Sequence, residues 1–333
     1  MSRIVSSKIG HPLSRWLYAF WKFSRPHTII GTCCSVIGLA ILALAYTSIE
    51  LPFQLSDRGA IDQPGLAWAA YGFGIVSALF PSLCANVYIV GLNQLEDVAI
   101  DRINKPSLPL ASGEFAIAEG RMIVAVTGIL ALVLAGLQGS FLFFTVLSSM
   151  VIGTAYSLPP IRLKRFPVWA AFCIFGVRGL IVNLGFFQHF QHCLSDSGII
   201  PLEVWALTIF IILFAFAIAI SKDIPDTEGD RRFKIQTLTI RFGTRAVLHL
   251  TRLVLTFCYA MLIGITGLGI LSVQPVFLIA THLGLLGLLW IRSFRVDLQN
   301  KRQISQFYQF IWQLFFLEYL LFPIAVVLRV VTE

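Results

Sequence analysis

The sequence predicts an all-α integral membrane protein with nine transmembrane helices. Of its 333 residues, 57% are hydrophobic and only 13% are charged, whereas a soluble domain carries roughly 25% charged residues. Nine apolar stretches reach the length of about 20 residues that a helix needs to cross a bilayer. Basic residues gather on one side of these stretches. We therefore expect a single membrane domain over residues 1–333.

The predicted spans follow one another along the chain after a cytoplasmic segment at residues 1–27, and the bundle occupies residues 28–328. Only Gly139 and Ser140 separate the third span from the fourth, and the seventh and eighth are separated by a similarly short connection around residues 272–275. Such short connections predict antiparallel neighbours. The nine spans lie at 28–46, 66–92, 121–138, 141–157, 168–189, 203–221, 249–271, 274–291 and 307–328.

The distribution of basic residues sets the predicted orientation. Nine spans place the N-terminus and the loops 93–120, 158–167, 222–248 and 292–306 on one side, which holds 22 of the 25 Lys and Arg residues when helix-end residues are counted with their loops. By the positive-inside rule this side is cytoplasmic. The net charge of +8 therefore follows from topology and indicates lipid contact and attraction for an anionic substrate, not binding of nucleic acid.

Two aspartate clusters lie at the predicted cytoplasmic ends of spans two and six. The first is NQLEDVAID at 93–101 and the second is KDIPDTEGD at 222–230. On a helix, residues four and eight positions apart share one face. We therefore expect Asn93, Asp97 and Asp101 to project together. By the same spacing we expect Lys222, Asp226 and Asp230 to do so, joined by Asp223.

The two clusters repeat in one register. Each of four charged residues in the first recurs 129 residues later: Asp97 as Asp226, Asp101 as Asp230, Arg102 as Arg231, and Lys105 as Lys234. This offset predicts two similar four-helix halves plus a ninth helix around a central cavity, as in other membrane bundles with parallel repeats. The two clusters then face each other across that cavity.

Gathered aspartates indicate a site for metal and diphosphate. Two like charges 4 Å apart repel by about 4 kcal/mol at an effective dielectric near 20, so a divalent cation between them is expected. Mg²⁺ prefers one or two carboxylates together with phosphate oxygens. Two clusters in register favour this site over a solvated acidic surface. The predicted metal ligands are Asp97, Asp101, Asp223, Asp226 and Asp230.

Basic side chains near the clusters are the predicted contacts for the substrate's phosphates, because Lys and Arg bind phosphate oxygens through charged hydrogen bonds. Arg25 and His27, just before span one, are further candidates for binding the carboxylate of an acceptor, although an arginine that snorkels to the membrane surface is the commoner case. The predicted substrate-binding residues are Arg25, Asn93, Arg102, Lys105, Arg162, Lys164, Lys222, Arg231 and Lys234.

The motifs resemble those of the UbiA superfamily of intramembrane aromatic prenyltransferases over nearly the whole chain. The resemblance rests on the two aspartate clusters, on RINKP at 102–106 and on AYSLPP at 155–160. Within the superfamily the chain is most similar to the homogentisate prenyltransferases, above all the phytyl-transferring cyanobacterial members. The stretches FSRPHT (23–28), NVYIVGLN (86–93), RLKRF (162–166), FKIQT (233–237) and FYQFIW (307–312) support this, as does Leu108 where many other members have Arg.

The resemblance implies Mg²⁺-dependent transfer of a phytyl group from phytyl diphosphate to homogentisate with loss of CO₂, in tocopherol biosynthesis. It also implies a cyanobacterial thylakoid or plasma membrane, with the active site at the cytoplasmic face. The catalytic residues are then Asp97, Asp101, Asp226 and Asp230, and Tyr156 stabilises the allylic cation with its ring. An interfacial Tyr is as often only an anchor in the membrane.

Three polar residues deep in the spans, Arg178, Asn183 and Glu318, have more than one interpretation. Such residues are functional candidates. A structural ion pair between Arg178 and Glu318 is slightly favoured over a contact of Arg178 with a substrate carboxylate. Glycines at 176, 179 and 185 either leave room for the prenyl tail or allow helices to pack closely.

Three other functions remain as alternatives. A homogentisate geranylgeranyl- or solanesyltransferase and a chlorophyll synthase share the prenyltransferase chemistry. A transporter of anionic lipid is a different class, but transporters usually bind their substrate near the midplane between broken helices, whereas these clusters lie at one face.

Overall fold

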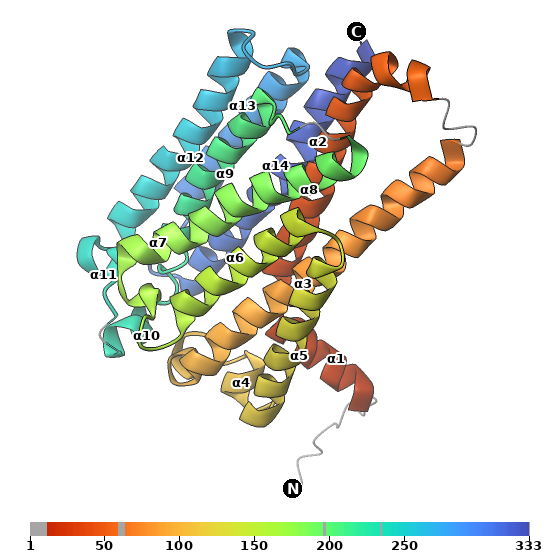
Figure 1. The fold of residues 1–333 in the computed structure, drawn as a ribbon. Coiled ribbons are helices and arrows are strands. Elements are labelled where there is room, and N and C mark those ends of the chain that lie inside the picture. The colour runs from red at the N-terminus through yellow and green to blue at the C-terminus, as the bar shows by residue number, and fades with distance from the viewer. Residues whose placement is uncertain (1–11, 59–63, 196–197, 234, 333) are drawn as a thin grey trace, which may run out of the picture.

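The computed structural model describes residues 12–58, 64–195, 198–233 and 235–332, which form a bundle of helices (Figure 1). In this part of the chain, nine helices are long and apolar enough to cross a membrane. This confirms the predicted number of spans. They are α2 (Pro26–Arg58), α3 (Pro64–Asn104), α5 (Ile117–Gly136), α6 (Ser140–Ser157), the α7–α8 helix (Pro167–Phe175 to Val182–Leu194), α9 (Leu202–Ser221), α12 (Thr244–Gly267), α13 (Pro275–Phe294) and α14 (Lys301–Thr332).

Short helices surround one end of this bundle. They are α1 (Pro12–Phe23), α4 (Pro109–Ser112), the 3₁₀ turn η1 (Leu163–Arg165), α10 (Thr227–Arg232) and α11 (Leu238–Phe242). Figure 1 shows α4, α10 and α11 at the same end of the long helices. These short elements lie in the N-terminal segment and in the loops at the end of the bundle where both aspartate clusters are found.

The hairpin between α5 and α6 follows the sequence prediction. Gly139 has φ of 110° and precedes α6. Only glycine adopts such a backbone conformation at little cost, because a Cβ atom would clash there. The connection can therefore be very short, and α5 and α6 lie antiparallel.

The bundle closes because α14 packs against α2, α9 and α13. Its centre is filled by aromatic side chains with no solvent exposure, such as Phe210, Tyr259 and Phe322. A second, smaller core holds α1 and α4 against α3 through Phe23 and Phe115. Close packing of these aromatic side chains stabilises both cores.

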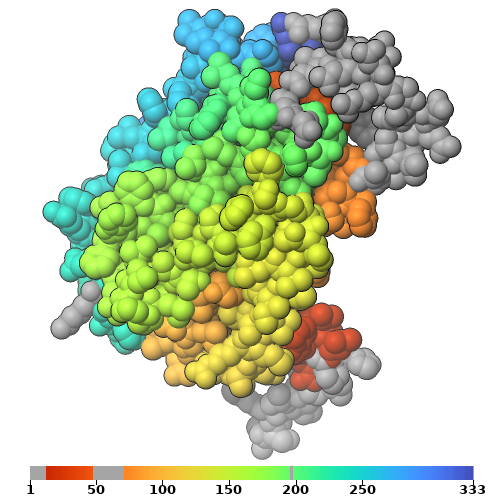
Figure 2. All heavy atoms as spheres, viewed as in Figure 1, coloured from red at the N-terminus to blue at the C-terminus, as the bar shows by residue number. Residues whose placement is uncertain are grey.

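The outside of the bundle is apolar, as a lipid-facing surface must be. Figure 2 shows that α5 to α8, in yellow and green, form a continuous outer face. Helices of this face expose large apolar side chains, among them Val133, Phe144 and Phe172. Contiguous exposed apolar surface of this kind marks a contact with membrane rather than with water.

Two helices differ from the predicted spans in ways that matter for the site. The helix α3 continues past residue 92 to Asn104 without a break, so the first aspartate cluster lies on a rigid helix. In the fifth span a six-residue π-helical segment, η2 (Gly176–Ile181), separates α7 from α8. Such segments occur frequently at functional sites, and nothing in the sequence predicted this one.

Candidate active site

Two adjoining cavities lie at the end of the bundle that carries both aspartate clusters. The outer cavity measures about 460 Å³ and the inner cavity about 250 Å³. The two cavities share lining side chains at their junction and so form one continuous space. We call the outer cavity, which both aspartate clusters line, the mouth. The shared lining residues are Arg25, His27, Asn93, Tyr156, Lys222 and Tyr308.

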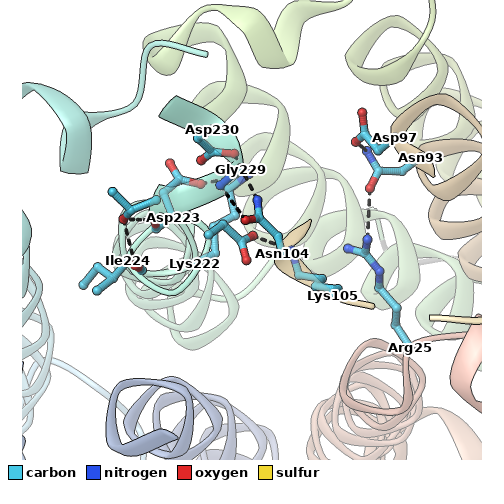
Figure 3. A network of polar contacts seen from close by, with 12 residues as sticks. Arg25, Asn93, Asp97, Asn104, Lys105, Lys222, Asp223, Ile224, Gly229 and Asp230 are labelled. Atoms are coloured by element: carbon cyan, nitrogen blue, oxygen red, sulfur yellow. Dashed lines mark hydrogen bonds and ion pairs between the residues drawn. The ribbon is translucent and has the colours of Figure 1, made fainter. Parts of the chain in front are cut away.

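The first cluster is arranged as the sequence predicts, along one face of α3. Asn93 Nδ2 donates to Asp97 Oδ2 at 3.0 Å. Arg25 lies in the break between α1 and α2 with φ of 52°, and its Nη2 donates to Asn93 Oδ1 at 3.1 Å (Figure 3). Arg25, Asn93 and Asp97 therefore form a polar chain across the mouth.

Two basic residues from the loop between α6 and α7 complete the surroundings of Asp97. Arg162 Nη2 lies 3.1 Å from Asp97 Oδ1, and Lys164 Nζ lies 2.7 Å from Asp97 Oδ2. Burial lowers the pKa of Lys164, while the Asp97 carboxylate opposes this effect. Arg162 and Lys164, predicted to contact phosphate, thus lie beside the first cluster.

The second cluster does not lie on a continuous helix, contrary to the spacing argument. The helix α9 ends at Ser221, residues 222–226 form turns, and α10 begins only at Thr227. Pro225 lies in this interruption, where a proline removes a backbone donor and prevents a regular helix. Lys222 and Asp226 still line the outer cavity with Asp223 and Asp230, but the turn, rather than a helical face, directs them there.

Direct contacts join the two clusters. Lys105 forms an ion pair with Asp226. Asn104 accepts from the Gly229 backbone N–H at 2.8 Å and donates to Asp230 Oδ1 at 3.4 Å, as Figure 3 shows. Asn104 was not predicted, although it follows Asp101 by three residues on α3 and therefore shares its face.

The carboxylates of the mouth are crowded. Burial, together with the nearby Asp223 and Asp226 carboxylates, raises the pKa of Asp230 to about 7. Burial also raises the pKa of Asp223. Asp101 is only 4% exposed, and its Oδ2 atom has no hydrogen-bond partner. Buried carboxylate oxygens normally have donors or cations beside them, so this mouth is built to receive positive charge.

Three of the predicted basic residues line neither cavity: Arg102 and Arg231, which are exposed, and Arg162, which pairs with Asp97. Lys234 lies outside the described residues. Among the described residues of the 129-residue register, the aspartates and Lys105 line the outer cavity.

The inner cavity is mostly apolar and begins at Tyr156. Lys222 Nζ donates to the Tyr156 hydroxyl at 2.7 Å and lies 5.4 Å from the centre of its ring. This contact fixes the predicted cation-stabilising tyrosine where the charged mouth meets the apolar space. The apolar lining of the inner cavity includes Ile89, Val146, Ile152, Val177, Ile218 and Phe315.

A profile of the UbiA prenyltransferase family matches residues 53–314. The chain belongs to this family. Homogentisate phytyltransferase of Synechocystis sp. is 50% identical over 310 residues, which cover 93% of this chain and 96% of that one. Homogentisate phytyltransferase 1 of Arabidopsis thaliana is 40% identical, covering 92% and 75%, and homogentisate geranylgeranyltransferase of Triticum aestivum is 38% identical, covering 95% and 74%.

Solved structures share the fold of this UbiA family member. A UbiA homologue from Archaeoglobus fulgidus bound to GPP and Mg²⁺ matches with a TM-score of 0.56 and 16% identity, covering 93% of this chain and 99% of that one. A digeranylgeranylglyceryl phosphate synthase matches with a TM-score of 0.59 and 18% identity, covering 93% and 98%. The nine-helix architecture is therefore that of the UbiA fold.

The mouth suits Mg²⁺ bound together with a phosphate ligand. Within the described residues, no three His, Cys, Asp or Glu side chains converge to hold an ion by themselves. Mg²⁺ does not require such a cage, because it is usually bound by one or two carboxylates plus substrate phosphates. The unpartnered oxygen of Asp101 and the crowded Asp223, Asp226 and Asp230 offer such carboxylates.

The structural ion pair predicted between Arg178 and Glu318 is wrong. Glu318 instead pairs with His282, with 3.1 Å between Oε2 and Nε2, and both side chains are fully buried. Asn183 is structural, since it donates to the Gly179 carbonyl at 2.8 Å and accepts from the Tyr319 hydroxyl at 2.7 Å. Arg178 lines the inner cavity.

Two of the three glycines in the fifth span serve helix packing. A Cβ atom on Gly179 would lie 2.4 Å from Ile212 Cγ1, and one on Gly185 would lie 2.0 Å from Thr145 Oγ1. Gly179 therefore brings the π segment against α9, and Gly185 brings α8 against α6. Neither of these two positions therefore leaves room for a prenyl tail.

Proposed function

We propose that this UbiA-family enzyme transfers a phytyl group from phytyl diphosphate to homogentisate, with Mg²⁺ as its cofactor. The observation that carries the proposal is the single cavity in which a mouth with two aspartate clusters and several cations leads into an apolar space. The 50% identical homogentisate phytyltransferase supports the choice of substrates.

The lysines and the aspartates of the mouth have different proposed roles in binding a diphosphate. Lys105, Lys164 and Lys222 line the outer cavity and would neutralise phosphate oxygens through charged hydrogen bonds. Asp97, Asp101, Asp223, Asp226 and Asp230 are the proposed metal ligands. Bound Mg²⁺ supplies Lewis-acid stabilisation of the charge on the leaving diphosphate.

Below the mouth, aromatic rings and the exclusion of water protect the allylic cation. When the C1–O bond breaks, the electron pair leaves with diphosphate. The Tyr156 ring lies at the junction of the two cavities and stabilises positive charge through its π face. A ring carbon of homogentisate then attacks C1 and loses its proton. The carboxylate leaves as CO₂, and the remaining CH₂ group takes up a proton to become methyl.

Two further parts of the proposal concern the prenyl donor and the side of the membrane on which the mouth lies. The relatives include geranylgeranyl-transferring and solanesyl-transferring enzymes, so the more unsaturated geranylgeranyl donor and the longer solanesyl donor are the second candidates. We place the mouth at the cytoplasmic face because most of the Lys and Arg residues lie on that side.

The test is turnover by purified protein in lipid nanodiscs. Homogentisate is incubated with phytyl, geranylgeranyl, solanesyl and geranyl diphosphates, and the products are separated by mass. We expect methyl-phytyl-benzoquinol as the main product, abolished by EDTA and restored by excess Mg²⁺. Preferred use of another donor would reassign the tail, and absence of any product from homogentisate would refute the acceptor.

A further inference from the structure

The inner cavity contains a guanidinium that no carboxylate among the described residues neutralises. Arg178 Cζ lies 4.8 Å from the centre of the Trp312 ring. Arg178 Nη1 lies 3.4 Å from the position that a Cβ atom on Gly31 would take. The guanidinium therefore extends from the fifth span into the space between α2 and α14, and there it lines the cavity.

Placing the Arg178 guanidinium in the inner cavity requires an uncommon backbone conformation and an unpaired charge within a membrane span. Arg178 belongs to the π-helical segment η2 (Gly176–Ile181), and π segments are rare outside functional sites. An unpaired cation within a membrane span is also unfavourable, and such residues usually face a partner or a cavity. Glu318, the acid that could have paired with it, is occupied by His282.

A second donor faces the same space. Trp312 also lines the inner cavity, and its buried Nε1 atom lies beside the Tyr308 hydroxyl but makes no hydrogen bond of ordinary geometry within the described residues. Buried donors are nearly always satisfied, so this N–H can still donate to a ligand. The His27 ring lies 5.0 Å from the Trp312 ring, tilted by 60°. The position thus offers one cation, one neutral donor and aromatic surface.

These groups fit a small aromatic carboxylate better than they fit a diphosphate. Arg178 and Trp312 line the inner cavity but not the outer one, whereas the lysines and aspartates line the mouth. A diphosphate with its metal is expected to stay with those charged groups. A carboxylate needs only the fork of one guanidinium, and an attached ring can pack on His27 and Trp312.

We propose that Arg178, assisted by Trp312 Nε1, binds the carboxylate of the aromatic acceptor and so determines acceptor specificity. The proposal rests on the proposed function, since homogentisate is the acceptor considered. The carboxylate points inward and the ring lies toward the mouth, where Tyr156 marks the junction of the cavities. Arg178 is a specificity residue in this role and does not take part in breaking the C1–O bond.

The test compares an acid with its neutral ester. Binding of homogentisate and of homogentisate methyl ester to Mg²⁺-loaded protein in nanodiscs is measured by calorimetry. Steady-state kinetics give KM for homogentisate and KM for phytyl diphosphate. A charged hydrogen bond is worth roughly 10- to 100-fold in affinity. We expect the wild type to prefer the acid by about that factor, and Arg178→Gln to lose the preference. The variant's KM for homogentisate should rise by a similar factor, while KM for phytyl diphosphate stays within about twofold.

A matched control is Arg252→Gln. Arg252 is also an arginine of a membrane-spanning helix, lies over the Phe294 ring at 5.3 Å and lines neither cavity. Its replacement should leave the acid preference and both KM values unchanged. If Arg178→Gln does not fold, Arg178→Lys replaces it, because lysine keeps the charge but loses the planar fork. This variant should lose several-fold of the acid preference without a loss of thermal stability.

An unchanged acid preference in a folded Arg178 variant overturns the proposal. The binding comparison does not depend on turnover, so it decides the role of Arg178 even if homogentisate is not prenylated. Absence of turnover in the wild type refutes the proposed function instead. Equal losses of affinity for acid and ester would mean that Arg178 only shapes the cavity, which also contradicts the proposal.

Discussion

At the scale of single residues, the aspartates of the mouth differ in surroundings. Asp97 is fully ion-paired with Arg162 and Lys164, and Asp226 pairs with Lys105. Asp101 has a carboxylate oxygen without any partner. The mouth therefore combines carboxylates held in place by cations with a carboxylate that is free to receive one.

Replacing a proposed metal ligand should abolish most activity without unfolding the protein. We expect Asp97→Asn, Asp101→Asn, Asp226→Asn and Asp230→Asn each to lower kcat by about 10²- to 10³-fold, the size of losing one preorganised electrostatic contact. Turnover at saturating Mg²⁺ and thermal unfolding measure the two effects. Glu228→Gln is the matched control, because Glu228 lies within the second cluster but is exposed and, in the described part of the chain, pairs with Arg232. Near-normal turnover in two of the four variants contradicts the assignment.

The raised pKa of Asp230 predicts how Mg²⁺ binding depends on pH. With a pKa of about 7 in the folded protein, this carboxyl is largely protonated below pH 7, and a metal ligand must be deprotonated. The Mg²⁺ concentration for half-maximal activity should therefore rise as pH falls from 8 to 6, by up to about tenfold per unit for one displaced proton. Asp230→Asn should flatten this dependence in its residual activity. A requirement independent of pH in the wild type would speak against Asp230 as a ligand.

At the scale of elements, the two clusters reach the same cavity by different means. The first lies on the rigid end of α3, and the second lies on the turn that Pro225 imposes between α9 and α10. In the fifth span, the π segment directs Arg178 into the cavity while Gly179 holds the segment against α9. The π segment therefore contributes both to helix packing and to the lining of the inner cavity.

The packing role of Gly179 predicts a loss of stability that is independent of the donor. A Cβ atom on Gly179 would lie 2.8 Å from the Ile212 Cα atom. Overpacking of this kind typically costs about 1–3 kcal/mol of folding stability. Gly179→Leu should therefore lower the thermal midpoint and reduce activity equally with phytyl and geranyl donors. Gly176→Leu is the control, because a Cβ atom on Gly176 meets no atom within 4 Å. A selective loss with the long donor would place the tail beside the π segment.

At the scale of the whole molecule, both clusters lie at one end of the bundle, and α14 closes the ring of helices by packing on α2. The positive-inside rule assigns that end to the cytoplasm. Exposed positions at this end are therefore expected to face the same compartment, and the far end of α8 the opposite one.

Labelling with a membrane-impermeant maleimide tests this orientation. Arg102→Cys and Arg231→Cys, both exposed at the ends of α3 and α10, should react only from the cytoplasmic side. The exposed native Cys193, near the far end of α8, serves as an internal control that reacts from the other side. Reaction of residues 102 and 231 from opposite sides would contradict the common mouth.

The sequence by itself determined the membrane class, the nine spans, the hairpin at Gly139 and the two aspartate clusters. These follow from local patterns, namely long apolar runs, a glycine at a tight turn and the spacing of charges along one helix. Only the tertiary structure decided the contact of Asn104 with Asp230, the pairing of Glu318 with His282 and the position of Arg178 in the inner cavity. Each of these depends on residues far apart in the chain meeting through helix packing, or on a π segment that has no sequence signature, and no local pattern contains that information.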